Sequence, residues 1–174
     1  NILRIHETYE DSRSIYLVME LASGGELFDV LSERGPVPEL DAAALLKQML
    51  HAIGYMHARN LVHGGVRTEN FMLSMPGDVM DVTLKISCLG LAVRGRGTVS
   101  FEKLTPKPGA PCYRSPQALK GRFTAPDDVW AAGVILHILL LGFPPFRGTT
   151  SAQIVKQVKT GSLCAAVDLL PEDV

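Results

Sequence analysis

A run of apolar residues in the last third of the chain constrains the fold more than any other feature. From Ala131 to Gly142 the only polar side chain is that of His137. This run of about 12 residues is well short of the roughly 20 that a helix needs to span a bilayer. The wider segment from Asp127 to Leu141 is apolar on almost every face, which predicts a helix surrounded by protein.

Two other segments have helical periodicity. From Glu39 to His57 the apolar residues recur at spacings of three and four, and Pro38 suits the first helical turn. These residues are Ala42, Leu45, Leu46, Met49, Ile53 and Met56. Ser151 to Thr160 predicts an amphipathic helix, which Gly161 would end.

Strand and turn signals occupy the first half of the chain. The strand runs are Ile15 to Met19, 61–63, Asn70 to Leu73 and Val82 to Ile86, and the turn signals are 23–25 and 76–78. The last two strands are predicted to pair as a hairpin, and a short helix is predicted to begin near Glu26. Without an internal repeat or a second domain, the chain is predicted to be one α+β domain.

The segment from Leu91 to Pro111 is poor in large apolar residues and predicts a long exposed loop, of a length that is often functional. Its Arg94 to Gly97 stretch resembles an arginine-glycine contact to nucleic acid. The net charge of −1 favours a plain loop instead, so we expect no nucleic-acid partner.

The three cysteines, Cys88, Cys112 and Cys164, are odd in number and form no CxxC pair. This pattern argues against a disulfide framework or a zinc site and favours a reducing, intracellular location. No targeting or membrane-spanning segment is visible. Because Asn1 already lies in sequence of folded character, we expect the chain to be a fragment.

Six motifs give the sequence a family resemblance. His63-Gly-Gly-Val-Arg-Thr-Glu-Asn70 resembles the HRDLKPEN catalytic loop of protein kinases, Cys88-Leu-Gly90 their DFG, and Ser115-Pro-Gln117 their APE. The fourth motif combines Asp128-Val-Trp130, Gly133 and 142–146, which resemble the DVWxxG and GxPPF segment of the family. The fifth and sixth motifs are the segments 16–20 and 24–28. Six motifs in the family's order and spacing are far more specific than any one of them.

The amino-acid sequences of segments 24–29 and 133–146 are most similar to those of calcium-dependent and calmodulin-dependent serine/threonine kinases. The resemblance implies the end of the small lobe and the hinge at 1–25, and a mainly α-helical large lobe with a small β hairpin at 26–174, truncated before its last helices. The small lobe, which would cover Ile15 to Met19, is almost entirely absent. A calcium-sensor domain could follow outside the chain.

The same resemblance identifies what the catalytic loop lacks. Phosphoryl transfer by a kinase uses a carboxylate that accepts the substrate proton and an Asp and an Asn that hold magnesium. Gly65 stands at the position of the first carboxylate and Cys88 at that of the metal-binding Asp, which leaves Asn70 as the remaining ligand. Arg67 replaces the lysine of the loop and keeps its charge.

Other matched residues have a structural and a functional interpretation. His63, Leu89 and Asp128, with Ile5 as a candidate, match a stack that ties the catalytic loop to the central helix, and Gly90 and Trp130 belong to the same framework. His63 is therefore interpreted as a core histidine. Met19, Glu20 and Met72 match residues around the adenine ring, but either methionine could be plain core. Glu26 and Glu69 match residues that bind ribose or substrate arginines, or are solvated carboxylates.

These observations predict a catalytically inactive, kinase-like module that binds protein partners, without a cofactor of its own, although the family uses ATP and magnesium. Two alternatives remain open. The chain could be a gene fragment without independent activity, or part of an active kinase or another nucleotide-using transferase whose missing parts lie outside it. If neighbouring segments are missing, we expect apolar residues of the helix near 129–141 to be exposed and the isolated chain to be poorly soluble or oligomeric.

Overall fold

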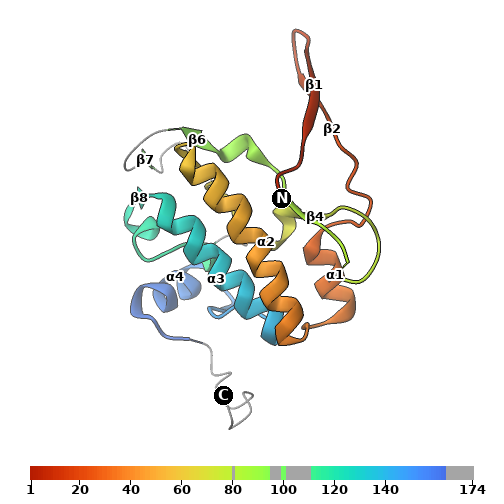
Figure 1. Cartoon of the computed structure of the whole chain (residues 1–174). Coiled ribbons are helices and arrows are strands. Elements are labelled where there is room, and N and C mark those ends of the chain that lie inside the picture. The colour runs from red at the N-terminus through yellow and green to blue at the C-terminus, as the bar shows by residue number, and fades with distance from the viewer. Residues whose placement is uncertain (80, 95–98, 101–110, 164–174) are drawn as a thin grey trace.

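A computed structural model describes residues 1–79, 81–94, 99–100 and 111–163. This part of the chain contains four α-helices and four small two-stranded sheets (Figure 1), which confirms the predicted α+β class. Its short 3-10 helices are Thr68–Asn70, Leu89–Leu91, Pro111–Tyr113 and Ala118–Lys120. No helix among the described residues is long and apolar enough to cross a membrane.

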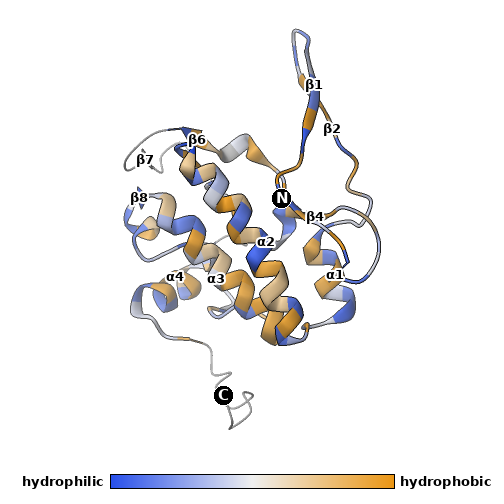
Figure 2. Ribbon diagram, in the orientation of Figure 1, coloured by the Kyte–Doolittle hydropathy of each residue, from blue (hydrophilic) through white to orange (hydrophobic). Residues whose placement is uncertain are grey.

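Two long helices, α2 (Glu39–Ala58) and α3 (Ala125–Leu141), lie side by side at the centre. Apolar residues, orange in Figure 2, gather on these helices and on α1 (Leu27–Arg34), and many of them form the main core. Helix α4 (Ser151–Thr160) has the predicted bounds, and Gly161 ends it in a left-handed conformation. The predicted helix at 39–57 is likewise confirmed, with one more residue at its end.

Helix α3 begins two residues before the predicted start. Thr124 and Asp127 form a reciprocal capping box, and Pro126 lies in the first turn, where its missing N–H is no loss. Seven of the 17 residues of the helix are buried, whereas Val129 is 48% and Leu140 36% exposed. The prediction of a helix covered on all sides is wrong at these two residues, because no described segment covers them fully.

The predicted central hairpin is confirmed. Strand β4 (Phe71–Leu73) pairs antiparallel with β5 (Leu84–Ile86), with Phe71 opposite Ile86. The first residues of the chain extend this pairing, since the Ile86 N–H donates to the Asn1 carbonyl (2.8 Å) and the Leu3 N–H to the Ile86 carbonyl (2.9 Å). On α2, Gln48 accepts a hydrogen bond from the Leu84 N–H (2.8 Å), so the hairpin is tied to the helical body.

A second hairpin projects from the body (Figure 1). It pairs β1 (Ile5–Glu10) with β2 (Ile15–Met19), and every residue of both strands is exposed. Strand β2 was predicted from its apolar residues, whereas β1 was not, because its polar and charged residues give no strand signal.

The region predicted as one long loop contains short strands. Strand β6 (Val93–Arg94) pairs with β3 (Leu61–Val62), and β7 (Val99–Ser100) pairs with β8 (Arg122–Phe123). The prediction of an unbroken loop over 91–111 is therefore wrong at these strands. Residues 95–98 and 101–110 lie outside the described part of the chain.

Candidate functional site

Asp128, near the start of α3, organises the loop at 63–70. Its Oδ2 accepts a hydrogen bond from the His63 N–H (2.8 Å) and its Oδ1 one from the Gly64 N–H (3.0 Å). The Nε2 of His57, on α2, lies 2.8 Å from Oδ2. The Asp128 side chain is 1% exposed, so these contacts replace the water that its charge has lost. The structure thus brings His63 and Asp128 together.

The ring of His63 is fully buried, and both of its nitrogens are engaged. Nε2 lies 3.0 Å from the Ser87 carbonyl, which only accepts, and Nδ1 lies 3.1 Å from the Gly65 N–H, which only donates. These partners require the neutral ring with its proton on Nε2. Burial lowers the pKa of the imidazole, which favours the same neutral form. The interpretation of His63 as a core histidine agrees with this geometry.

Backbone contacts hold the middle of the loop, at the position predicted for the proton acceptor. The Asn70 amide donates to the Gly65 carbonyl (2.6 Å), and the Ser87 N–H donates to the Asn70 carbonyl (2.8 Å). The Gly65 N–H donates to His63 and the Gly65 carbonyl accepts from Asn70, so Gly65 contributes two backbone contacts and no side chain. The loop is shaped without a carboxylate at that position.

The charged side chains of the loop bind each other. The Arg67 guanidinium donates to the Glu69 carboxylate, and this hydrogen bond raises the pKa of Arg67. Burial alone would raise the pKa of Glu69, but the hydrogen bond from Arg67 and its charge bring it below the ordinary value. Thr68 donates to Glu69 (3.0 Å) and also contacts the Tyr113 hydroxyl (3.0 Å). Arg67 and Glu69 are thus engaged within the loop.

Cys88 precedes the turn at Leu89–Leu91 in a left-handed conformation, with φ 61° and ψ 48°. Its thiol is free and exposed. Leu89 is 36% exposed and Gly90 is exposed beside it. A thiol is a soft ligand that suits magnesium poorly, and one amide from Asn70 does not complete an oxygen shell. Within the described residues no three His, Cys, Asp or Glu side chains are grouped so as to hold a metal ion.

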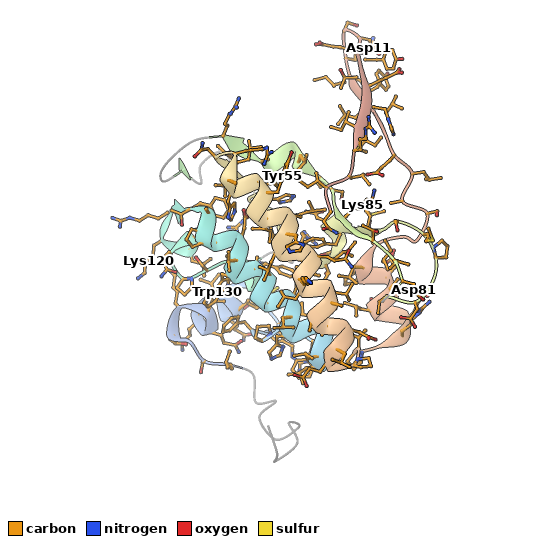
Figure 3. All side chains as sticks on the ribbon, in the orientation of Figure 1. Asp11, Tyr55, Asp81, Lys85, Lys120 and Trp130 are labelled. Atoms are coloured by element: carbon orange, nitrogen blue, oxygen red, sulfur yellow. The ribbon has the colours of Figure 1, made fainter. Side chains whose placement is uncertain are left out.

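The residues predicted around an adenine ring lie at the base of the projecting hairpin. Glu20 accepts a hydrogen bond from the Lys85 ammonium and one from the Arg4 N–H (2.7 Å), which lower its pKa, Lys85 more strongly. Figure 3 labels Lys85, which lies on β5 opposite Met72.

Glu26 and Met72 are brought together by an isolated β-bridge. Met19, at the end of β2, is 44% exposed and pairs with Ile5, which is 41% exposed. The backbone thus links Glu26 with Met72 and Met19 with Ile5, and Glu20 follows Met19 directly in the chain.

Trp130 connects α3 to the segment that follows it. Its ring stacks on Phe146, with centroids 6.1 Å apart and planes 6° from parallel. This contact joins the motif at 128–133 to the motif at 142–146, as expected for a framework residue. In Figure 3, Trp130 lies on α3 in the helical body.

The family model for the protein kinase domain matches residues 1–171 of the chain. The chain belongs to the protein kinase family.

Several calcium-dependent protein kinases are similar to this kinase domain. Calcium-dependent protein kinase 5 of Plasmodium berghei is 36% identical over 161 residues, which cover 92% of the chain and 28% of that protein. Calcium-dependent protein kinase 4 of the same organism is 40% identical over 161 residues, covering 92% of the chain and 30% of the relative. For calcium-dependent protein kinase 12 of Arabidopsis thaliana the identity is 38% over 163 residues, with 94% and 32% covered. The chain thus spans about a third or less of these relatives' length.

Three contacts between residues far apart in the kinase domain were missed by reasoning from sequence. They are His57 with Asp128, Thr68 with Tyr113, and Ser115, whose hydroxyl donates to Asp127. The residues of each pair lie at least 12 positions apart in the chain. The one available signal was Asp127 three residues after Thr124, the spacing of a capping box.

Proposed function

We propose that this kinase domain does not transfer phosphate as it stands and acts instead as a module that binds protein partners. The observation that carries the proposal is Gly65. At the position matched to the proton-accepting carboxylate there is only a backbone held by His63 and Asn70. Losing a general base costs on the order of 10²- to 10⁴-fold in rate.

The metal-binding position supports the same conclusion. Cys88 offers an exposed thiol where the resemblance places a carboxylate, so the Asn70 amide is the one oxygen donor left at this position. Arg67, matched to the lysine that contacts the transferring phosphate, is engaged by Glu69. We further propose that residues 1–25 are the end of a small lobe with the hinge and 26–174 a large lobe, so that the loop covering the nucleotide phosphates lies outside these 174 residues. We also propose that the protein needs no ATP or magnesium of its own and that it is intracellular, because its three cysteines form no CxxC pair.

A specific observation favours a second candidate. The loop at 63–70 keeps its anchoring to Asp128 and its contact between His63 and Ser87, and its relatives are calcium-dependent protein kinases. This intact framework would suit one part of an ATP-dependent serine/threonine kinase. Segments outside the chain would then complete the kinase, and a calcium sensor among them would regulate it. A gene fragment without independent activity is the remaining possibility.

Calorimetric titration with magnesium-ATP, together with radiolabel transfer to a basic peptide, tests the proposal. We expect no saturable heat and no transfer. The variant that combines Gly65→Asp with Cys88→Asp is expected to stay inactive in this chain, because the loop that covers the nucleotide phosphates lies outside the 174 residues. Transfer by the unaltered chain that disappears with Asn70→Ala would show that the domain is an active kinase.

A further inference from the structure

Basic and acidic residues are segregated along the sequence. The segment 42–68 contains no Asp or Glu, and the segment 82–126 contains Glu102 alone. These two segments nevertheless contain most of the 17 Lys and Arg residues of the chain. Because the net charge is −1, the remaining segments are correspondingly acidic. Such an asymmetry predicts a local cationic surface on a molecule that is nearly neutral as a whole.

The structure brings parts of these two segments together around a small core. The buried side chains of Val62, Ala118 and Phe123 pack on one another. Val62 lies on β3 and Phe123 on β8, whereas Ala118 begins a 3-10 helix. Strand β6 joins this group because Val93 pairs with Val62. In Figure 1, β6 and β8 lie at the same end of the helical body as the last turn of α2.

Four exposed cations surround this small core and are called the basic rim: Arg59, Arg94, Lys120 and Arg122. Side chains alternate along a strand, so the buried Phe123 leaves the neighbouring Arg122 on the outer face. Arg59 follows α2 directly, two residues before β3. Within the described part of the chain, none of the four forms an ion pair with a carboxylate. Charged side chains lie at protein surfaces in any case, so the exposure of these four follows from their own chemistry.

We propose that the basic rim binds a short acidic segment of a protein partner, rich in Asp and Glu. This inference rests on the proposed function and names the class of partner that the module takes. Three of the four cations are arginines, whose planar guanidinium group binds a carboxylate through two parallel hydrogen bonds. The carboxylates of the partner supply the negative charge that the described residues do not place beside the rim.

The distribution of charge favours a short acidic segment over an extended polyanion. A nucleic-acid duplex or an anionic membrane reaches beyond the basic rim, and the acidic remainder of the chain would repel it. The guanidinium of Arg59 covers one face of the Tyr55 ring, 3.5 Å from its centroid, so that face is closed to stacking on a base. A short acidic segment contacts the rim alone and meets no such repulsion.

Fluorescence anisotropy of a labelled oligoglutamate peptide, titrated with the 174-residue chain, tests the proposal. We expect saturable binding that weakens as salt is added, and no binding of an oligoglutamine peptide of the same length. Arg94→Gln combined with Arg122→Gln should raise the dissociation constant about tenfold, because it removes two cations of the rim. The matched control, Arg13→Gln with Lys156→Gln, removes the same charge at exposed residues outside the rim and should leave the affinity unchanged. Circular dichroism of each variant checks that the helices persist.

Three results would overturn the proposal. One is the absence of saturable oligoglutamate binding, and another is equal weakening by the rim variant and its control, which would mean that net charge and not the rim decides the affinity. The third is tighter binding to a DNA duplex or to phosphatidylserine vesicles than to oligoglutamate. Failure to bind oligoglutamate would leave the proposed loss of phosphoryl transfer untouched. Conversely, phosphoryl transfer by the unaltered chain would overturn the proposed function without changing the result of the peptide titration.

Discussion

The Nε2 of His57 lies 2.8 Å from the carboxylate of Asp128 and so joins α2 to α3 beside the catalytic-type loop. Asp128 also receives the N–H groups of His63 and Gly64, so it is a single buried acceptor for three donors. Removing one donor leaves a buried carboxylate with an unmade hydrogen bond, which lowers the free energy of unfolding more than the loss of a contact at the surface does.

We expect His57→Phe to lower the free energy of unfolding by about 1 to 3 kcal/mol, because it removes one donor from Asp128. Urea unfolding followed by circular dichroism measures the change. His51→Phe, an exposed position on the same helix, is the matched control and should change stability by less than about 0.5 kcal/mol. Equal effects of the two substitutions would mean that the contact with Asp128 contributes nothing.

Acid should destabilise the domain through His63. Burial lowers the pKa of this imidazole below its ordinary value of 6.5, so the unfolded chain binds the proton first as the pH falls. The stability is complete above about pH 6.5 and decreases as the pH falls below that value toward the lower pKa of the folded state. Urea midpoints between pH 8 and 5 should therefore fall, and His63→Gln should have a shallower dependence. Parallel curves for both proteins would contradict the prediction.

Alkali should destabilise the domain through the segment at 112–113. Burial raises the pKa of Cys112 to about 11 and that of Tyr113 to about 12, whereas their ordinary values are 9.0 and 10.0. Stability is thus fully present below pH 9 and is lost as the pH rises through 11, because the unfolded chain ionises first. The Cys112 contribution is up to about 3 kcal/mol. In the Cys112→Ala variant, denaturant midpoints between pH 8.5 and 10.5 should fall less than in the unaltered chain.

The left-handed conformation of Cys88 predicts a stabilising substitution. A left-handed backbone costs an ordinary residue roughly 1 to 2 kcal/mol, whereas asparagine tolerates it. Cys88→Asn should therefore raise stability by about 0.5 to 1 kcal/mol, and Cys88→Val, which is β-branched, should lower it. Thermal unfolding under reducing conditions compares the two variants. A lower midpoint for Cys88→Asn than for the unaltered chain would be the contrary result.

Local sequence patterns were sufficient for the helices and the central hairpin. Helix α4 has the predicted bounds, and the helix beginning at Glu39 extends one residue beyond the prediction, because apolar periodicity and terminal glycine act within a few residues. The early start of α3 was missed because the capping box at Thr124 lies outside the apolar run. Strand β1 was missed because its strand conformation depends on pairing with β2 and not on its own composition.

The sequence named the residues of the candidate loop but not the contacts that hold them. The motif at 63–70 identified Gly65, Asn70 and His63, and six motifs together identified the family. The mutual engagement of Arg67 and Glu69 was not predicted, because charged side chains two residues apart have many possible partners. The contact of His57 with Asp128 spans 71 positions and depends on how α2 packs on α3, which no local pattern encodes.

The role of Asp128 also has a consequence for the time at which the loop acquires its shape. The loop's backbone is fixed by a residue that lies 64 and 65 positions further along the chain from Gly64 and His63. During synthesis, which adds about 5 to 20 residues per second, the loop leaves the ribosome several seconds before its anchor exists. The closure of so long a segment precedes any gain from the contact. The catalytic-type loop therefore cannot complete its anchoring until Asp128 has been synthesised, and a ribosome stalled before residue 128 would carry the loop without these two hydrogen bonds.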